Sequence, residues 1–586
     1  MRTNRKTEEK KMSMSKNIAR LAVTAGLTAA LSFGGVMAPV TMAFAEGGST
    51  VTFEDAYSST TTYKGIQIFA ANVSGSTASN IQWAGADDAQ KQKIQEAVVQ
   101  AIDSWSVAND KGNYRSKNAQ DAAEWLCTNA NVGGDNSRVA SDNVLNEIAK
   151  KLSAEGFTWK KTTQGKNTLD DLDAGYWLFL TASVNNPTEG SAASQSTDAF
   201  TSPIFKLVDG ATPVKIAPKK KIPTVEKEIL NDRDENNQDG YTAQEGWSNV
   251  ADSQVGQEVS YKLTGTIADN YATYDTYTYK FTDTLSQGLT YAKDSLEVYA
   301  LNGQKWAKIN PESYNAVEPA GGNGVLTVNF DKGNGLKSAT AANDDETLNI
   351  GAETKIVVFY KAELNSKASY EVAGNDNKVY LEYSNNPMAA GTGKSVTKVV
   401  TDHVFRLDVT KVDSEDTNKK LKAGFKVKVM DGEGSEDADS QGKWLAQDGT
   451  LVTEDKAYEF TTDETSGQIY IPGLDAGKYQ ITETTTPKGY NTIAPVIITV
   501  TPDYDDDGNL TGLKVSDNSG MVDTNNVTNA TDATIPVTIR NKKGSNLPLT
   551  GLNGVTFTWI AGGAVLCIGV AHLIRSRKQA EESERE

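Results

Sequence analysis

Histidine and cysteine, two residue types that often carry enzyme chemistry, are nearly absent from this chain. His403 is the only histidine outside an apolar tail, which leaves no histidine-based catalytic triad and no histidine-rich zinc site. Cys127 is likewise the only cysteine outside that tail, so no disulfide can form within the rest of the chain. No phosphate-binding glycine loop or dinucleotide fingerprint is evident. We therefore expect no enzyme and no cofactor, and any covalent staple must use other side chains.

A lysine, a glutamate and an asparagine stand on three separate segments of residues 402–543. Lys411 ends the run 407–411, Glu483 lies in the alternating run 479–484, and Asn541 ends the run 537–541. This region resembles the CnaB-type Ig-like domains of bacterial pilins and adhesins. The resemblance implies an isopeptide bond between Lys411 and Asn541, with Glu483 as the assisting acid.

The chemistry of these side chains is consistent with such a bond. An ε-amine is nucleophilic only when neutral, and burial among apolar groups lowers the pKa of a lysine. The same burial raises the pKa of a carboxyl group, so that it can act as an acid at neutral pH. Holding amine and amide in contact supplies a high effective concentration, and the loss of ammonia makes the step effectively irreversible. The alternative to an isopeptide bond is a conventional salt bridge between the lysine and the glutamate, near a surface asparagine.

Residues 216–401 resemble the CnaA-like middle domain of backbone pilins, through the segments 222–227, 279–291 and 377–387. The resemblance implies a second set, Lys227, Asp283 and Asn377, in which the aspartate takes the role of the glutamate. Asn377 begins an alternating run that we expect to be the last strand, while Asn375 and Asn385 remain alternatives. Asp283 could instead cap a turn, where aspartate is favoured.

The first domain shows no comparable set. Its Leu172-Asp-Ala-Gly-Tyr segment echoes Leu474-Asp-Ala-Gly-Lys-Tyr of the third domain. Aligning the two puts Leu180 or Thr181 where Glu483 would be, and neither is a carboxylic acid. This comparison predicts no intramolecular bond there.

A cluster of lysines joins the first two domains. The segment Val214-Lys-Ile-Ala-Pro-Lys219 resembles the pilin motif of backbone subunits, whose lysine attacks the acyl intermediate that a sortase forms on the next subunit. Lys219 falls at the matching position, although Ala217 replaces the usual tyrosine. Lys220 and Lys221 follow directly and remain alternatives. A solvated basic linker is the plain alternative.

The C-terminal end carries a motif, an apolar run and a basic cluster in that order. The run from Leu552 to about Ile574 is long enough to cross a bilayer, and basic residues follow it. This order resembles the cell-wall sorting signal of Gram-positive surface proteins. The resemblance implies cleavage by a sortase between Thr550 and Gly551, and transfer of Thr550 to an amine. The sorting motif comprises Leu547, Pro548, Leu549, Thr550 and Gly551.

The remaining elements place these residues on a mainly β scaffold. An N-terminal basic region, an apolar stretch and Ala43-Phe-Ala45 predict an export signal over 1–45. Residues 46–215 mix strands with helical periods at 88–105 and 141–155, which predicts an α+β domain. Short alternating segments then dominate and predict tandem Ig-like β-sandwiches over 216–401 and 402–543. Residues 544–586 form the sorting signal, transmembrane segment and basic tail.

The composition limits the partners. A net charge of −18 argues against nucleic-acid binding, which needs a basic surface. Acidic turns at 232–239 and 503–508 are more often solvated than metal-bound, and Lys514 stands where a calcium loop needs a carboxylate. We therefore predict no metal site.

These features together predict the shaft subunit of a covalent pilus on the Gram-positive cell wall. Lys219 and Thr550 would link copies of the chain head to tail, which generates a filament. The predicted partners are pilin-specific and housekeeping sortases, tip or ancillary pilins, and peptidoglycan. The alternative is a wall-anchored adhesin or ancillary pilin that binds host matrix or glycan itself.

Overall fold

We describe a computed structural model of the chain. It describes residues 48–55, 60–130, 139–154, 156–184, 196–218, 220, 222–230, 240–243, 245–321, 323–343, 345, 347–430, 442–517, 519–520, 522–524, 527–528 and 530–544. The sorting motif, the predicted export signal, the predicted transmembrane segment, Lys219, Lys221 and the acidic turn 232–239 lie outside these residues. Within them, no helix is long and apolar enough to cross a membrane.

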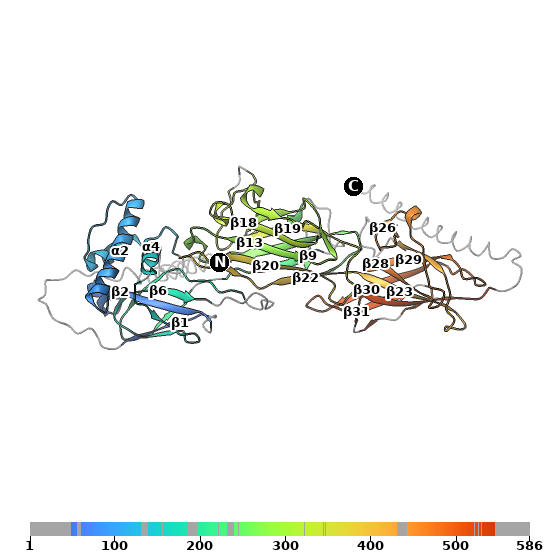
Figure 1. The fold of residues 1–586 in the computed structure, drawn as a ribbon, viewed down its shortest axis with the longest axis horizontal. Coiled ribbons are helices and arrows are strands. Elements are labelled where there is room, and N and C mark those ends of the chain that lie inside the picture. The colour runs from blue at the N-terminus through green and yellow to red at the C-terminus, as the bar shows by residue number, and fades with distance from the viewer. Residues whose placement is uncertain are drawn as a thin grey trace, which may run out of the picture.

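The described elements form three groups that follow one another along the long axis of the molecule (Figure 1). Strands dominate all three groups, and the α-helices of the described residues lie in the first, so the predicted mainly β fold with an α+β beginning is confirmed. We call the groups the N-terminal part (48–216), the middle part (222–403) and the C-terminal part (404–544).

The N-terminal part packs helices on one face of a sheet and a small sheet on the other. The main sheet has the order β3-β2-β6-β7 with β4 beside β2, and the small sheet has the order β5-β1-β8. Its strands are β1 (Ser49–Phe53), β2 (Thr62–Ser74), β3 (Thr77–Trp83), β4 (Lys160–Lys161), β5 (Thr168–Leu172), β6 (Gly175–Ser183), β7 (Ile204–Val208) and β8 (Val214–Ile216). Its helices are α2 (Asp88–Ala108), α3 (Ala119–Asn129) and α4 (Val144–Leu152).

Hydrophobic periodicity explains the helices. Ile94, Val98 and Ile102 recur at helical spacing on α2 and are buried against the sheet together with Ile148 of α4. Asp87 caps α2 by accepting a hydrogen bond from the Gln90 N–H. The helices predicted at 88–105 and 141–155 are thus present, the second as a shorter helix.

The middle part is a sandwich of two sheets. One has the order β10-β9-β12-β19-β15-β16, with β14 beside β19, and the other β11-β22-β20-β13-β18-β17, with β21 beside β20. The strands are β9 (Val225–Leu230), β10 (Trp247–Ser248), β11 (Val250–Asp252), β12 (Glu258–Thr266), β13 (Tyr279–Leu285), β14 (Leu289–Tyr291), β15 (Glu297–Asn302), β16 (Lys305–Lys308), β17 (Asn315–Val317), β18 (Gly324–Phe330), β19 (Lys355–Leu364), β20 (Asn375–Ser384), β21 (Thr392–Lys394) and β22 (Lys398–His403). The run that begins near Asn377 is β20, and it is not the last strand, since β21 and β22 follow in its sheet.

The C-terminal part is a second sandwich. Its sheets have the orders β28-β23-β34-β32 and β26-β25-β24-β29-β30-β31-β33, with β27 beside β24. The strands are β23 (Phe405–Asp413), β24 (Gly424–Val429), β25 (Trp444–Leu445), β26 (Leu451–Val452), β27 (Phe460–Thr461), β28 (Gln468–Leu474), β29 (Gly477–Thr485), β30 (Val496–Tyr504), β31 (Leu510–Asp517), β32 (Val522–Thr524), β33 (Val527–Thr528) and β34 (Thr534–Asn541). β23 and β34, the first and last strands, are parallel neighbours.

Candidate functional site: buried lysines beside acids and amides

The C-terminal part brings Lys411, Glu483 and Asn541 together in its core. Lys411 comes from β23, Asn541 from the adjacent β34, and Glu483 from β29 of the facing sheet. The Lys411 ammonium contacts the Asn541 side-chain carbonyl oxygen and lies 3.5 Å from the Glu483 carboxylate. The Asn541 side-chain N–H group donates to Glu483 at 2.9 Å. The side chains of Lys411 and Glu483 have 0% exposure, and Asn541 is fully buried as well.

This arrangement suits the attack of an amine on an amide. Burial lowers the pKa of Lys411 to about 8, although Glu483 opposes the shift, so an appreciable neutral fraction exists near neutral pH. Glu483 touches both the attacking nitrogen and the amide nitrogen that would leave. It therefore lies where a carboxyl group can carry a proton from one to the other. The Glu483 carboxylate thus lies beside the nitrogen that would leave.

Other hydrogen bonds hold Glu483 in place. Its carboxylate accepts the Ile493 N–H at 3.0 Å and the Thr486 hydroxyl at 3.3 Å. The Asn541 amide also donates to the Asn491 carbonyl oxygen at 3.0 Å. The segment 486–493 therefore fixes the acid and the leaving group but not the amine.

The middle part builds a similar site from Lys227, Asp283 and Asn377. Lys227 on β9 contacts the carboxylate of Asp283 on β13, across the sandwich, and both side chains are at most 1% exposed. Burial lowers the pKa of Lys227 and raises that of Asp283, although each group opposes the other's shift. Asp283 therefore does not cap a turn; it is a buried acid in the middle of a strand.

Tyr360 connects the three groups and was not predicted from the sequence. Its hydroxyl lies 3.1 Å from the Lys227 amine, donates to Asp283 at 3.1 Å, and accepts the Asn377 side-chain N–H at 2.6 Å. Tyr360 sits in an alternating strand like many other tyrosines of this chain, so no local signal marks it. Only the pairing of β12 with β19 brings it beside β9.

The structure distinguishes the three candidate asparagines. Asn377 is fully buried and reaches Tyr360. Asn375 instead bonds the backbone of Ser369 and Asp402, and Asn385 bonds the Asp198 carbonyl oxygen. Only Asn377 of the three therefore shares the site of Lys227 and Asp283.

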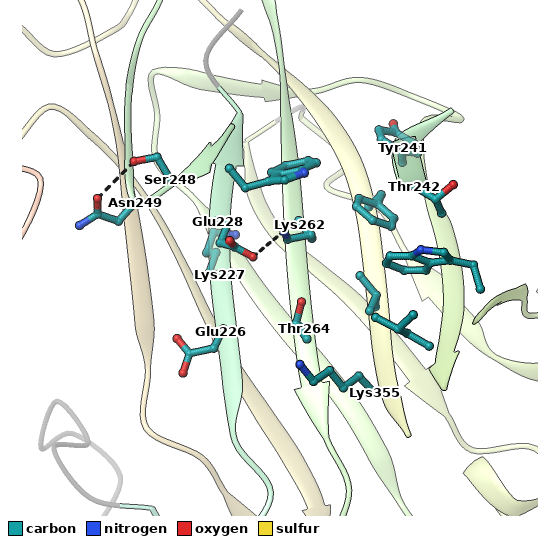
Figure 2. A pocket seen from close by; sticks show the side chains of 15 residues that line it. Glu226, Lys227, Glu228, Tyr241, Thr242, Ser248, Asn249, Lys262, Thr264 and Lys355 are labelled. Carbon is teal, nitrogen blue, oxygen red and sulfur yellow. Dashed lines mark hydrogen bonds and ion pairs between the residues drawn. The ribbon is translucent and has the colours of Figure 1, made fainter. Parts of the chain in front are cut away.

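Strand β9, which carries Lys227, also lines a groove on the outside of the sandwich. Glu226 and Glu228 flank Lys227 in sequence and face a groove outside the sheet, whereas the Lys227 amine points into the core (Figure 2). Lys262 on β12 lies directly opposite Glu228 on β9, pairs with it at 2.7 Å and lies over the Trp247 ring. The aromatic rings there are stacked on each other, Tyr241 on Phe359 at 5.0 Å.

The lysine cluster is described at one of its three positions. The Lys220 side chain is 1% exposed and pairs with the carboxylates of Asp55, at 3.0 Å, and Asp198. By contrast, Lys215 on β8 is 76% exposed. Lys219 and Lys221 lie outside the described residues.

Acidic turns do not gather into a metal site among the described residues, where no group of three or more metal-ligating side chains occurs. Asp503 pairs with Lys514 at 2.7 Å, and Asp505 accepts the N–H groups of Asp507 and Asn509 in its own turn.

One known protein family matches part of the C-terminal sandwich. The family model described as SpaA, prealbumin-like fold domain, matches residues 405–512, which cover most of the C-terminal part. The chain is also a homologue of the trypsin-resistant surface T6 protein of Streptococcus pyogenes serotype M6, with 24% identity over 329 residues. The match covers 54% of this chain and 50% of the relative, so the chain spans about half the length of the curated relative it matches.

Backbone pilins are among the solved structures to which this chain is similar. The T6 backbone pilin of serotype M6 Streptococcus pyogenes is 16% identical with a TM-score of 0.43, over 85% of this chain and 98% of that chain. The full-length major pilin SpaD of Corynebacterium diphtheriae is 15% identical with a TM-score of 0.38, over 86% of this chain and 99% of that chain.

Proposed function

We propose that this chain is the structural shaft subunit of a covalent pilus anchored to the cell wall. The observation that carries the proposal is the pair of buried lysine, acid and asparagine sites, one in each sandwich of a chain homologous to a bacterial surface protein. Each site can cross-link two strands of its sandwich through a lysine amine and an asparagine amide, which suits a subunit that bears mechanical load.

Each cross-link would form by condensation of the lysine amine with the asparagine amide. The Lys411 nitrogen bonds to the Asn541 side-chain carbon, the bond from that carbon to its nitrogen breaks, and ammonia leaves. Glu483 relays the proton, because it contacts both nitrogens. In the middle part Lys227 and Asn377 take the roles of amine and amide. Asp283 contacts Lys227 and would pass the proton to the Asn377 nitrogen through the Tyr360 hydroxyl, which contacts all three groups.

Subunits would be joined by a further lysine. Sortase would cut the Leu547–Gly551 motif after Thr550 and pass the acyl group to a lysine of the next subunit. Lys220 is a poor acceptor because its amine is buried between two carboxylates. Lys219 therefore remains the first choice among the three lysines, with Lys221 as the alternative. The same machinery would attach the filament to peptidoglycan and to tip or ancillary pilins.

Polymerisation tests this proposal in cells that carry a pilus-assembly sortase. Wild-type chain should give a ladder of high-mass species that resist boiling in SDS, and Lys219→Ala should give monomer. Lys215→Ala is the matched control, because Lys215 is exposed on the same segment and should leave the ladder intact. A ladder that persists in Lys219→Ala and disappears in Lys221→Ala would move the junction, and a wild-type monomer would exclude the shaft function.

A further inference from the structure

The connector between the N-terminal and middle parts contains a buried lysine, Lys220, that the proposed assembly does not use. The Lys220 ammonium lies between the carboxylates of Asp55 and Asp198, and the exposed fractions of the three side chains are 1%, 5% and 1%. Three separate segments supply them: the end of β1, the segment before β7, and the connector after β8. Burying ionised groups is costly unless they are closely paired.

Hydrogen-bond donors surround the two acids in different ways. Asp198 accepts the Thr61 hydroxyl on one oxygen and the Ala199 N–H, at 2.7 Å, on the other. Asp55 accepts the Tyr63 hydroxyl, and the Tyr63 ring lies 5.5 Å from the Lys220 nitrogen. Donors on both oxygens of Asp198 are placed to stabilise the negative charge that develops there when its carbon is attacked. Asp55 is left beside the lysine nitrogen as a proton carrier.

This is the same division of roles as in the other two parts: a buried amine, an acceptor carbonyl group and a separate acid. We propose that Lys220 and Asp198 condense to a third intramolecular isopeptide bond, assisted by Asp55. The bond forms between the Lys220 nitrogen and the Asp198 side-chain carbon. One carbon–oxygen bond of Asp198 breaks, and its oxygen leaves as water with two protons from the ammonium, one of them relayed by Asp55. No outside reactant is needed, and an ion pair is exchanged for a neutral amide.

The proposed bond would lie at the junction between the N-terminal and middle parts. The segment that carries Asp198 is hydrogen-bonded to the middle part: Phe200 N–H donates to the Asn385 carbonyl oxygen at 2.7 Å, and Asn385 donates to the Asp198 carbonyl oxygen at 3.3 Å. Thr197 N–H donates to the Lys394 carbonyl oxygen at 2.8 Å. A bond between Lys220 and Asp198 would therefore link the connector covalently to the N-terminal part at its contact with the middle part. The sequence comparison predicted no bond here because it searched β6 for the acid, whereas these acids lie on other segments.

Peptide mapping of the denatured full chain tests the proposal. Trypsin would cut after Lys219 and Lys221 but not after a modified Lys220, so the dipeptide 220–221 should remain attached to peptide 167–206. The joined species should weigh about 18 Da less than the two peptides together, the mass of the water lost in condensation of an amine with an acid. Fragmentation should place the branch on Asp198.

Variants separate the roles. Asp198→Asn should still join, because loss of ammonia gives the same amide and hence the same product mass as wild type. Asp55→Asn should leave Lys220 and Asp198 in contact and reduce the joined fraction at least tenfold. Lys215→Ala should not affect it. Unmodified peptide 167–206 with full cleavage after Lys220 in the wild-type chain would overturn the proposal, as would a branch on Asp55. The measurement needs no sortase, so it fails or succeeds independently of polymerisation.

Discussion

At the scale of single residues, the proposed chemistry depends on how far burial lowers the pKa of a lysine amine. An exposed lysine is protonated at neutral pH and cannot attack an amide, whereas burial favours the neutral form. Lys411 and Lys227 both have lowered pKa values for this reason. In the proposed reactions, the same residue type serves as a nucleophile in the core and as a solubilising charge on the surface.

The Lys411–Asn541 bond should form faster as the pH rises toward 8. Burial lowers the pKa of Lys411 to about 8, so below that pH the neutral, reactive fraction falls about tenfold for each pH unit. The joined fraction of newly synthesised chain, measured by mass at successive times, should follow this slope between pH 6 and 8 and level off above. A rate independent of pH over this range would contradict the role of the neutral amine.

Tyr360→Phe should slow bond formation in the middle part alone. The substitution removes a hydroxyl that contacts Lys227, Asp283 and Asn377, and leaving such buried groups without a partner costs about 1–3 kcal/mol. We expect the Lys227–Asn377 bond to form roughly tenfold more slowly. The Lys411–Asn541 bond of the same molecule is the internal control, and an equal delay in both bonds would indicate a general folding defect instead.

At the scale of elements, the sites join strands that lie far apart in sequence. β23 and β34 are separated by nearly the whole C-terminal part, yet they are parallel neighbours in register from Arg406 with Thr534 to Asp413 with Asn541. A bond between such strands acts on the unfolded chain, because it forbids most of its extended conformations.

Lys411→Met should destabilise the C-terminal part by about 5 kcal/mol. The 130 positions between Lys411 and Asn541 form a long closed loop, and cross-links of this kind remove about that much chain entropy. Methionine fills a similar volume without a charge. Denaturant midpoints should fall in this variant and not in Lys426→Met on β24, where the lysine is only half-buried. Equal midpoints for Lys411→Met and wild type would show that no bond forms.

Two of the three described α-helices could be predicted from the sequence. The helical periods at 88–105 and 141–155 were sufficient to predict α2 and α4, because large apolar residues recur on one face. Helix α3 (Ala119–Asn129) was not predicted, since its buried face consists mostly of alanines, which give weak contrast.

The residues of the two proposed isopeptide sites were predicted from a resemblance to pilin domains, and alternating strand patterns accompany them. Lys411, Glu483 and Asn541 end or occupy alternating runs, and the structure brings all three together. Nothing in the sequence distinguishes Lys220 from the adjacent Lys219 and Lys221. Its distinct environment arises from Asp55 and Asp198, which are 165 and 22 positions away and whose proximity depends on the pairing of β1 with β8.

At the scale of the whole molecule, the three parts lie in a row and meet through specific contacts (Figure 1). Between the middle and C-terminal parts, the Gln254 side chain donates to the Gly449 carbonyl oxygen at 2.9 Å, and Tyr504 donates to Asp252 at 2.9 Å. His403 stacks on Tyr504 with ring centroids 5.0 Å apart. In the proposed filament, load would enter near residue 219 and leave at Thr550, so it would pass through these two parts and not through the N-terminal part.

Single-molecule pulling between residue 219 and Thr550 should therefore show no unfolding step of the wild-type C-terminal sandwich, because the Lys411–Asn541 bond would join its first and last strands. Lys411→Met should release one additional step of up to roughly 440 Å, because about 130 residues would extend at ~3.4 Å each. The Lys215→Ala variant should behave as wild type. An unfolding step of that length in the wild-type chain would contradict the cross-link.

The most direct test of the account is the chemistry of the junction between two subunits. Filaments assembled on cells should be purified, digested and fragmented by mass spectrometry. The account predicts a branched peptide in which the Thr550 carbonyl carbon of one subunit is amide-bonded to the Lys219 amine of the next. Filaments that dissociate into intact monomers in SDS, or a junction that uses Lys220, would contradict it.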